Sequence, residues 1–179
     1  TWIGSPKEAP LYGQWLWRDG GKMVVVCEGE IDALSISQMQ GHKWPVVSVQ
    51  NGAQGASRSI RKATEWLNKF ETVVFMFDMD EAGRAAAIEC AKLLPPGKAK
   101  IANLKEAKDA NELLTSGRGS EIIDAIWGAS VYRPDGIVRA AELWDRVSAD
   151  VDVSCVDYPY GKLTEKTGGI RKGELVTIT

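Results

Sequence analysis

Two aspartates, Asp78 and Asp80, stand one residue apart at the end of an apolar run, in VVFMFDMDEAG. Side chains at positions i and i+2 of an extended chain point to the same side, so the two carboxylates project together, with their Cα atoms roughly 7 Å apart. Such a pair of hard anionic oxygens suits a divalent cation, above all Mg²⁺. Two ions held in this way can activate a hydroxyl group and stabilise a leaving oxygen in phosphoryl transfer.

Three further acidic residues are predicted to reach the same place. Glu28 ends the apolar run KMVVVCEG, Asp32 follows it by one helical turn, and Asp109 lies in KDANE after a later strand. Carboxylates gathered at one edge raise each other's pKa unless a cation neutralises them. We therefore predict a magnesium site, in which Mn²⁺ can substitute for Mg²⁺, with Glu28, Asp78 and Asp80 as catalytic ligands. Asp32 and Asp109 are additional candidate ligands.

The same residue types also have a purely structural interpretation. Acidic residues at strand ends are common turn formers and helix caps, and Asp80 directly precedes a helical stretch that begins at Glu81. The D-x-D pair alone is therefore weak evidence of a metal site. The second acidic motif, Glu28-Gly29 at the end of another buried strand, favours the metal interpretation.

The elements that position these residues alternate between strands and helices. Apolar runs rich in β-branched residues predict strands over residues 22–29, 44–49, 72–77 and 98–104. Helical periodicity predicts helices over residues 30–41, 57–70, 81–94, 109–117 and 120–129. QNGAQG, between the second strand and its helix, is predicted to be a glycine-rich turn, with Ser57 as the helix cap. This alternation predicts an α/β fold with a mainly parallel sheet flanked by helices, whose ligands gather beyond the carboxyl ends of the strands.

The bulk composition restricts the classes of function. The chain has 179 residues and a formal net charge of −2, so nucleic acid must be attracted by a local patch and not by an overall positive field. The three cysteines are far apart and form no C-x-x-C pair, which argues against a disulfide framework or a zinc cluster. No apolar run approaches the roughly 18 residues of a membrane span. A reducing, cytosolic setting without a membrane partner fits these features.

After about residue 129 the pattern changes. SVYRPDG reads as a linker, and IVRAAELWDRVSAD predicts an amphipathic linker helix whose apolar face consists of Ile137, Ala140, Ala141, Trp144 and Val147. This helix either folds back on its own domain or docks as an arm on a neighbouring subunit. The final GELVTIT reads as a strand cut at its end, and we expect the chain to be a fragment of a longer protein.

The two acidic motifs, in this order, resemble the Toprim fold. The marks of that fold are Glu-Gly-x-x-Asp after the first strand and D-x-D after the third, here in VVVCEGEIDAL and VVFMFDMDEAGRAAA. Bacterial-type primases, type IA and II topoisomerases and some nucleases share it, and D-x-D-x-A-G-x-x-A with an alanine-rich helix is most similar to the primase branch. The resemblance covers about residues 20–127.

The remainder of the chain resembles the junction of a primase with a ring helicase. GGIRKGELVTIT is similar to the first strand of a RecA-like helicase domain, and the segment ahead of it is similar to the linker helix that joins ring subunits. This is the layout of phage primase-helicases of the T-seven type. It implies an upstream primase subdomain ending in 1–22, a Toprim domain in 23–128, a linker with its helix in 129–150, and the start of a truncated helicase domain in 151–179.

The resemblance also implies an activity: magnesium-dependent synthesis of short RNA primers on single-stranded DNA. Asp78 and Asp80 would be magnesium ligands, and Glu28 a ligand or an acid-base group. The implied partners are the DNA template, nucleoside triphosphates, further copies of the chain in a ring and a replicative DNA polymerase, in the cytoplasm of an infected bacterial host. The chain contains no G-x-x-x-x-G-K-[ST] loop, so we do not expect it to hydrolyse nucleotide as a helicase does.

Three basic residues near the turns of the site are candidates for contacting nucleotide or template phosphates: Arg58, Arg61 and Arg84. Charges on a helix surface more often only meet solvent, so this assignment is the weaker part of the site.

Other functions fit parts of the pattern. A Toprim nuclease or topoisomerase would use the same carboxylates, and a topoisomerase would also need a catalytic tyrosine, for which no tyrosine here has a distinctive context. A phosphatase of the haloacid dehalogenase type would carry its D-x-D on the first strand and not the third. The non-enzyme alternative is an oligomerisation and linker module whose acidic residues are structural.

Overall fold

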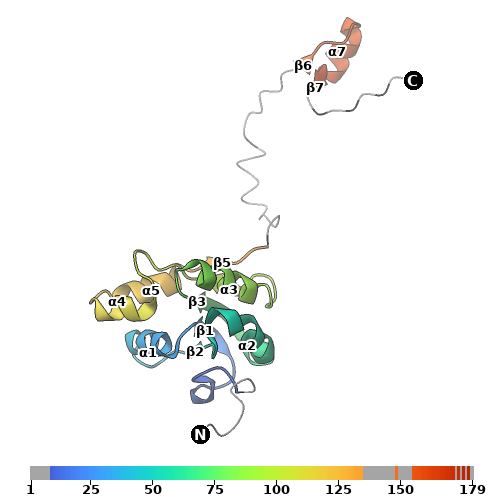
Figure 1. The fold of residues 1–179 in the computed structure, drawn as a ribbon. Helices are drawn as coiled ribbons and strands as arrows, with labels where there is room; N and C mark the ends of the chain where they lie inside the picture. Colours follow the sequence, from blue (N-terminus) through green and yellow to red (C-terminus); the bar gives the residue numbers. More distant parts are fainter. Residues whose placement is uncertain are drawn as a thin grey trace. The chain divides into compact units, whose positions relative to one another are not determined.

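The computed structural model describes residues 9–134, 148, 155–171, 173, 175 and 177. The chain divides into two compact units, residues 1–135 and 136–179 (Figure 1). The predicted domain boundaries at residues 22, 128 and 150 stay predictions. The predicted linker helix, with its apolar face from Ile137 to Val147, lies outside the described residues.

The first unit is built on a five-stranded sheet with the strand order β2-β1-β3-β4-β5. Its four parallel strands are β1 (Gly21–Cys27), β2 (Val46–Ser48), β3 (Phe70–Met76) and β4 (Ala99–Ile101). The short β5 (Ser130–Val131) pairs with β4 in the antiparallel sense. The predicted α/β fold with a mainly parallel sheet is therefore confirmed.

Helices cover both faces of this sheet, which explains why its central strands are continuous apolar runs. On one face, α2 (Gly52–Leu67) and α3 (Glu81–Ala91) pack over a core that includes Val24 and Phe75. On the other face, α1 (Glu30–Met39), α4 (Ala110–Thr115) and α5 (Ser120–Trp127) pack over a core that includes Val25 and Val74. Successive strand residues thus enter opposite cores, as the period of two requires.

The segment before β1 packs along the edge strand β2. Leu11 is buried, Tyr12 forms an isolated antiparallel bridge with Ser48, and the short 3₁₀ helix η1 (Gln14–Leu16) follows. The indole Nε1 of Trp17 donates a hydrogen bond to the carbonyl oxygen of Val46 at 3.0 Å. These contacts cover the backbone of an edge strand that would otherwise be open to pairing.

The structure corrects the prediction for the connection between β2 and α2. The helix begins at Gly52 and not near Ser57, so most of the predicted glycine-rich turn is its first turn. Gly52 has φ +58°, a conformation that glycine adopts without steric cost and that lets the chain enter the helix directly after Asn51. The Asn51 side chain makes no cap hydrogen bond. The prediction was wrong because it considered only capping residues close to the helix in the sequence. The side chain that caps the first turn of α2 is Glu28, which directly follows β1.

The second unit has described structure over residues 155–171. Strands β6 (Cys155–Val156) and β7 (Ile170–Arg171) form a two-stranded antiparallel sheet, and α7 (Gly161–Thr167) connects them. The assignment of this unit to the start of a helicase domain stays a prediction. In the part of the chain that the structure describes, no helix is both long enough and apolar enough to cross a membrane.

Candidate functional site

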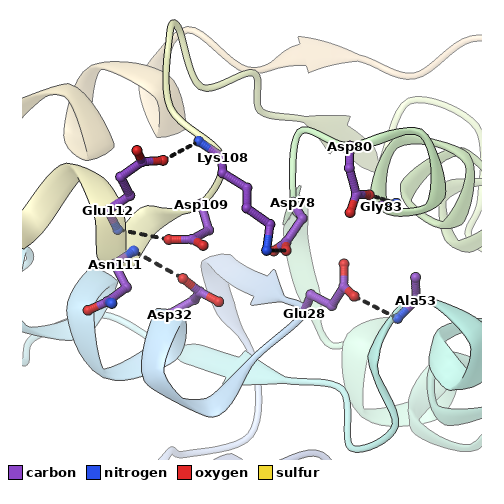
Figure 2. Close-up of polar contacts among 10 residues, drawn as sticks. All are labelled: Glu28, Asp32, Ala53, Asp78, Asp80, Gly83, Lys108, Asp109, Asn111 and Glu112. Atoms are coloured by element: carbon purple, nitrogen blue, oxygen red, sulfur yellow. Dashed lines mark hydrogen bonds and ion pairs between the residues drawn. The ribbon is translucent and has the colours of Figure 1, made fainter.

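The carboxyl ends of β1 and β3 lie side by side, because the two strands pair in parallel with Cys27 opposite Met76. Glu28 directly follows β1, and Asp78 follows β3, so the two acidic motifs reach the same edge of the sheet. We call the five predicted ligands at this edge the acidic edge: Glu28, Asp32, Asp78, Asp80 and Asp109. Figure 2 shows them together with their polar contacts.

Two members of the acidic edge cap the helix that follows them in the sequence. Asp80 is the N-cap residue of α3 and accepts a hydrogen bond from the backbone N–H of Gly83 at 2.7 Å. Asp109 is the N-cap residue of α4 and accepts one from the N–H of Glu112 at 2.8 Å. The structural interpretation of Asp80 as a helix cap is therefore confirmed, and it leaves the second carboxylate oxygen available for a further contact.

Two other members accept helix N–H groups from distant parts of the chain. Oε1 of Glu28 accepts a hydrogen bond from the N–H of Ala53, in the first turn of α2, at 2.9 Å. Oδ1 of Asp32 accepts one from the N–H of Asn111, in the first turn of α4, at 3.0 Å. Three helices thus direct N-terminal N–H groups at the acidic edge, and the positive ends of their dipoles favour negative charge there (Figure 2).

Asp78 is held differently from the other four. Its Oδ2 lies 3.5 Å from the ammonium nitrogen of Lys108, and its side chain is 18% exposed compared with 63% for the lysine. Lys108 belongs to the loop before α4, and neither its charge nor its position was included in the predicted site. The signal was present in the sequence, because Lys108 directly precedes Asp109 in the KDANE segment.

Burial and mutual repulsion raise the pKa of three carboxyls of the acidic edge. Burial raises the pKa of Asp32 to about 6, the charges of its carboxylate neighbours add to the shift, and the N–H of Asn111 opposes it. Burial also raises the pKa of Glu28, with a further contribution from Asp78. The pKa of Asp78 is raised by burial as well, and the nearby Lys108 ammonium opposes this shift.

This arrangement fits a divalent cation held by few protein ligands. Oε2 of Glu28 is buried and has no hydrogen-bond partner within the described part of the chain, so an acceptor is left over for a cation. As the side chains are placed, no three His, Cys, Asp or Glu residues among those described lie close enough to hold one ion together. Mg²⁺ is usually bound by one or two carboxylates and completes its shell with water and substrate phosphates. The acidic edge suits that mode and not a closed protein cage.

The three predicted phosphate contacts lie in different surroundings. Arg84, in the first turn of α3, lines a cavity of about 300 Å³ whose wall also includes Asp78 and Asn103. Arg58 and Arg61 are exposed on α2, whose first turn binds Glu28. Arg84 therefore shares a cavity with one member of the acidic edge, Asp78, and the phosphate role of all three residues stays a prediction.

A Toprim-like family model matches residues 25–114, which is half of the chain and includes the whole acidic edge. The chain belongs to the Toprim-like family. A protein of Enterobacteria phage T3 described as a DNA helicase/primase is 42% identical over 181 aligned positions, which cover 98% of this chain and 31% of that protein. The Toprim-like chain thus spans about a third of the length of this relative.

Solved structures agree with the family. The primase fragment of the bacteriophage T7 primase-helicase is 45% identical with a TM-score of 0.62, over 65% of this chain and 48% of that one. A second T7 structure contains primase domains of two subunits with the lagging-strand DNA polymerase, an RNA/DNA hybrid and dTTP. Its matching chain is 44% identical with a TM-score of 0.64, over 68% of this chain and 61% of that one. The predicted Toprim fold and the resemblance to phage primase-helicases of this type are confirmed.

A more distant structure supports the fold alone. A DNA primase domain from Pseudomonas aeruginosa has 23% sequence identity and a TM-score of 0.51, over 70% of this Toprim-like chain and 40% of that chain.

Proposed function

We propose that this chain is the Toprim core of a phage primase-helicase and takes part in the magnesium-dependent synthesis of short RNA primers on single-stranded DNA. The observation that carries the proposal is the meeting of Glu28 and Asp78, from two separate strands, at one edge of the sheet. The 42% identity with a phage DNA helicase/primase supports the same reaction class.

The residues of the acidic edge take different roles in this proposal. Asp78 and Asp80 bind Mg²⁺, which when bound neutralises phosphate charge and activates a hydroxyl group. Glu28 acts as a further ligand or as an acid-base group, and its raised pKa brings it closer to neutral pH, where a proton is most readily exchanged. Asp32 binds the first turn of α4, Asp109 caps the same helix, and both are secondary candidates for the ion.

Substrate phosphates are expected on the basic side chains around the acidic edge. Arg84 is the first candidate, because it lines the same cavity as Asp78. Arg58 and Arg61 are candidates for the template backbone, since both are exposed on a helix that begins beside Glu28. A guanidinium group recognises phosphate oxygens with two parallel donors, which suits either role.

The whole protein would act with several partners. We infer a single-stranded DNA template, nucleoside triphosphates, other copies of the chain in a ring and a replicative DNA polymerase. The T7 structure that combines two primase subunits with a polymerase and an RNA/DNA hybrid supports the polymerase and nucleic-acid partners by similarity. The cytoplasm of the infected bacterial host is the place where these partners meet.

A manganese titration followed by electron paramagnetic resonance tests the site directly. The chain is titrated with Mn²⁺ in the presence and absence of ATP, and compared with Asp78→Asn and Asp80→Asn. We expect binding in the unmodified chain, strengthened by ATP, and a loss of at least about tenfold in both variants. Equal binding by all three proteins would contradict the proposed metal site.

The reaction class is tested with single-stranded oligonucleotides, labelled ribonucleotides and Mg²⁺. We expect short RNA products that depend on the template and disappear in Asp78→Asn. Shortened DNA with no RNA product would instead identify a nuclease, and altered linking number of a plasmid would identify a topoisomerase.

A further inference from the structure

Lys108 lies at the acidic edge and has no role in the function proposed above. Its backbone is fixed on both sides: the carbonyl oxygen accepts a hydrogen bond from the N–H of Met79 at 2.8 Å, and its own N–H donates to Oε2 of Glu112 at 2.7 Å. The side chain is 63% exposed and reaches Asp78 at 3.5 Å. A fixed backbone with a long exposed side chain lets the ammonium group move by several ångströms without any change of fold.

The charges around Lys108 keep its ammonium group at this edge. The ammonium nitrogen lies 3.5 Å from Oδ2 of Asp78, and Asp109 directly follows Lys108 in the chain. An exposed lysine is charged at neutral pH, so its ammonium group is attracted by the carboxylates of the acidic edge.

We propose that Lys108 binds substrate phosphate by an exchange of partners: its ammonium group pairs with Asp78 until a divalent cation takes that carboxylate, and it then contacts a phosphate of the nucleoside triphosphate. The inference rests on the proposed function, since it needs a cation and a nucleotide at the acidic edge. Lys108 would thus contact the substrate directly. It would also weaken binding of the cation when no nucleotide is present.

Electrostatics explains why Lys108 would weaken binding of the cation alone and strengthen binding of the nucleotide. A cation that approaches Asp78 must displace or repel the ammonium group 3.5 Å away, so Lys108 weakens binding of the ion alone. A bound ion neutralises the carboxylate and frees the ammonium group. The triphosphate then brings several negative oxygens to the same place, and lysine is a common ligand of phosphate as a mobile point charge. The same side chain is thus expected to weaken metal binding and strengthen nucleotide binding.

The test compares Lys108→Met and Lys108→Arg with Lys105→Met, which removes the same charge from an exposed position of the same loop. Mn²⁺ binding is measured by electron paramagnetic resonance without nucleotide, and ATP binding by calorimetry at saturating Mn²⁺. For Lys108→Met we expect Mn²⁺ to bind about two- to fivefold more tightly, the range of an exposed ion pair, and ATP to bind about five- to tenfold more weakly. Lys108→Arg and Lys105→Met are expected to stay within about twofold of the unmodified chain.

Other outcomes would overturn the inference. Unchanged affinities in Lys108→Met would mean that the lysine forms a surface ion pair only. Tighter binding of both Mn²⁺ and ATP would make it a competitor of the ion without a phosphate role. Weaker binding of both, with a lower melting temperature, would make it a structural residue. Binding of Mn²⁺ and ATP by the unmodified chain supports the proposed function in each of these cases, and binding of neither would overturn both proposals.

Discussion

The carboxylate of Glu28 accepts a hydrogen bond from the backbone N–H of Ala53 at 2.9 Å, which ties the end of β1 to the first turn of α2. The other oxygen of the same carboxylate is buried and has no partner among the described residues. One side chain thus acts as a helix cap through one oxygen, and the other oxygen is the one that we propose for a cation. The two roles can be separated by substitution.

Glu28→Gln is expected to retain the hydrogen bond from the N–H of Ala53 and to lose affinity for Mn²⁺. The amide oxygen can still accept the N–H of Ala53, and the loss of a negative charge relieves repulsion at the acidic edge, so the free energy of unfolding should be unchanged or higher by up to about 1 kcal/mol at neutral pH. Glu28→Ala removes the cap and should cost about 1 kcal/mol. Urea denaturation measures both, and Mn²⁺ titration should show weak binding in each. Equal destabilisation by Gln and Ala would contradict the cap.

The helix-capping role of Asp80 can also be separated from its proposed role as a metal ligand. Asp80→Ser retains an N-cap oxygen for the N–H of Gly83 and should change the free energy of unfolding by only a few tenths of a kcal/mol, whereas Asp80→Ala should lower it by about 0.5 to 2 kcal/mol. Both variants remove the charge and should lose Mn²⁺ affinity. Chemical denaturation and Mn²⁺ titration of the pair check this, and a Ser variant that retains full Mn²⁺ affinity would restrict Asp80 to capping.

Asp32 predicts a pH dependence of stability. Its pKa is raised to about 6 in the folded chain, so the folded state binds the proton more tightly than the unfolded state does. The resulting stabilisation is complete below pH of about 4 and is lost as the pH rises through about 6. Asp32→Asn keeps an acceptor for the N–H of Asn111 and does not titrate. At pH of about 7.5 the variant should be more stable by about 1 to 2 kcal/mol, with allowance for partial exposure, and by much less near pH 4.5.

The measurement is urea denaturation of both proteins across this pH range, without divalent ions. A difference in free energy that does not change with pH would show that the Asp32 carboxyl titrates alike in the folded and unfolded states.

Gly83 is expected to resist substitution. A Cβ atom at this position would overlap the carbonyl oxygen of Asp78, which is backbone and cannot rotate away. Gly83→Ala should therefore lower the free energy of unfolding by about 1 to 3 kcal/mol and displace Asp78, with a loss of Mn²⁺ affinity. Gly161→Ala is the matched control, because a Cβ there meets open space and the residue lies in a helix. Thermal melting of Gly83→Ala and Gly161→Ala is the measurement. Equal melting temperatures for the two variants would contradict the close contact between Gly83 and the carbonyl oxygen of Asp78.

The sequence by itself determined the alternation of strands and helices and the edge at which Glu28 and Asp78 meet. Both depend on short-range patterns: buried parallel strands need continuous apolar runs, and the carboxyl ends of such strands meet at one edge. The D-x-D and Glu-Gly-x-x-Asp motifs therefore predicted four of the five members of the acidic edge, and the KDANE segment supplied Asp109.

The tertiary structure alone decided how those carboxylates are held. The N–H of Ala53 reaches Glu28 and the N–H of Asn111 reaches Asp32 across long stretches of chain. The first of these bonds lies in the first turn of α2, which begins at Gly52. The ion pair of Lys108 with Asp78 likewise joins residues that are far apart in the sequence. Local propensity describes a helix and its neighbours in the sequence, whereas a cap or counter-ion from another element depends on packing of the whole sheet, which no local pattern contains.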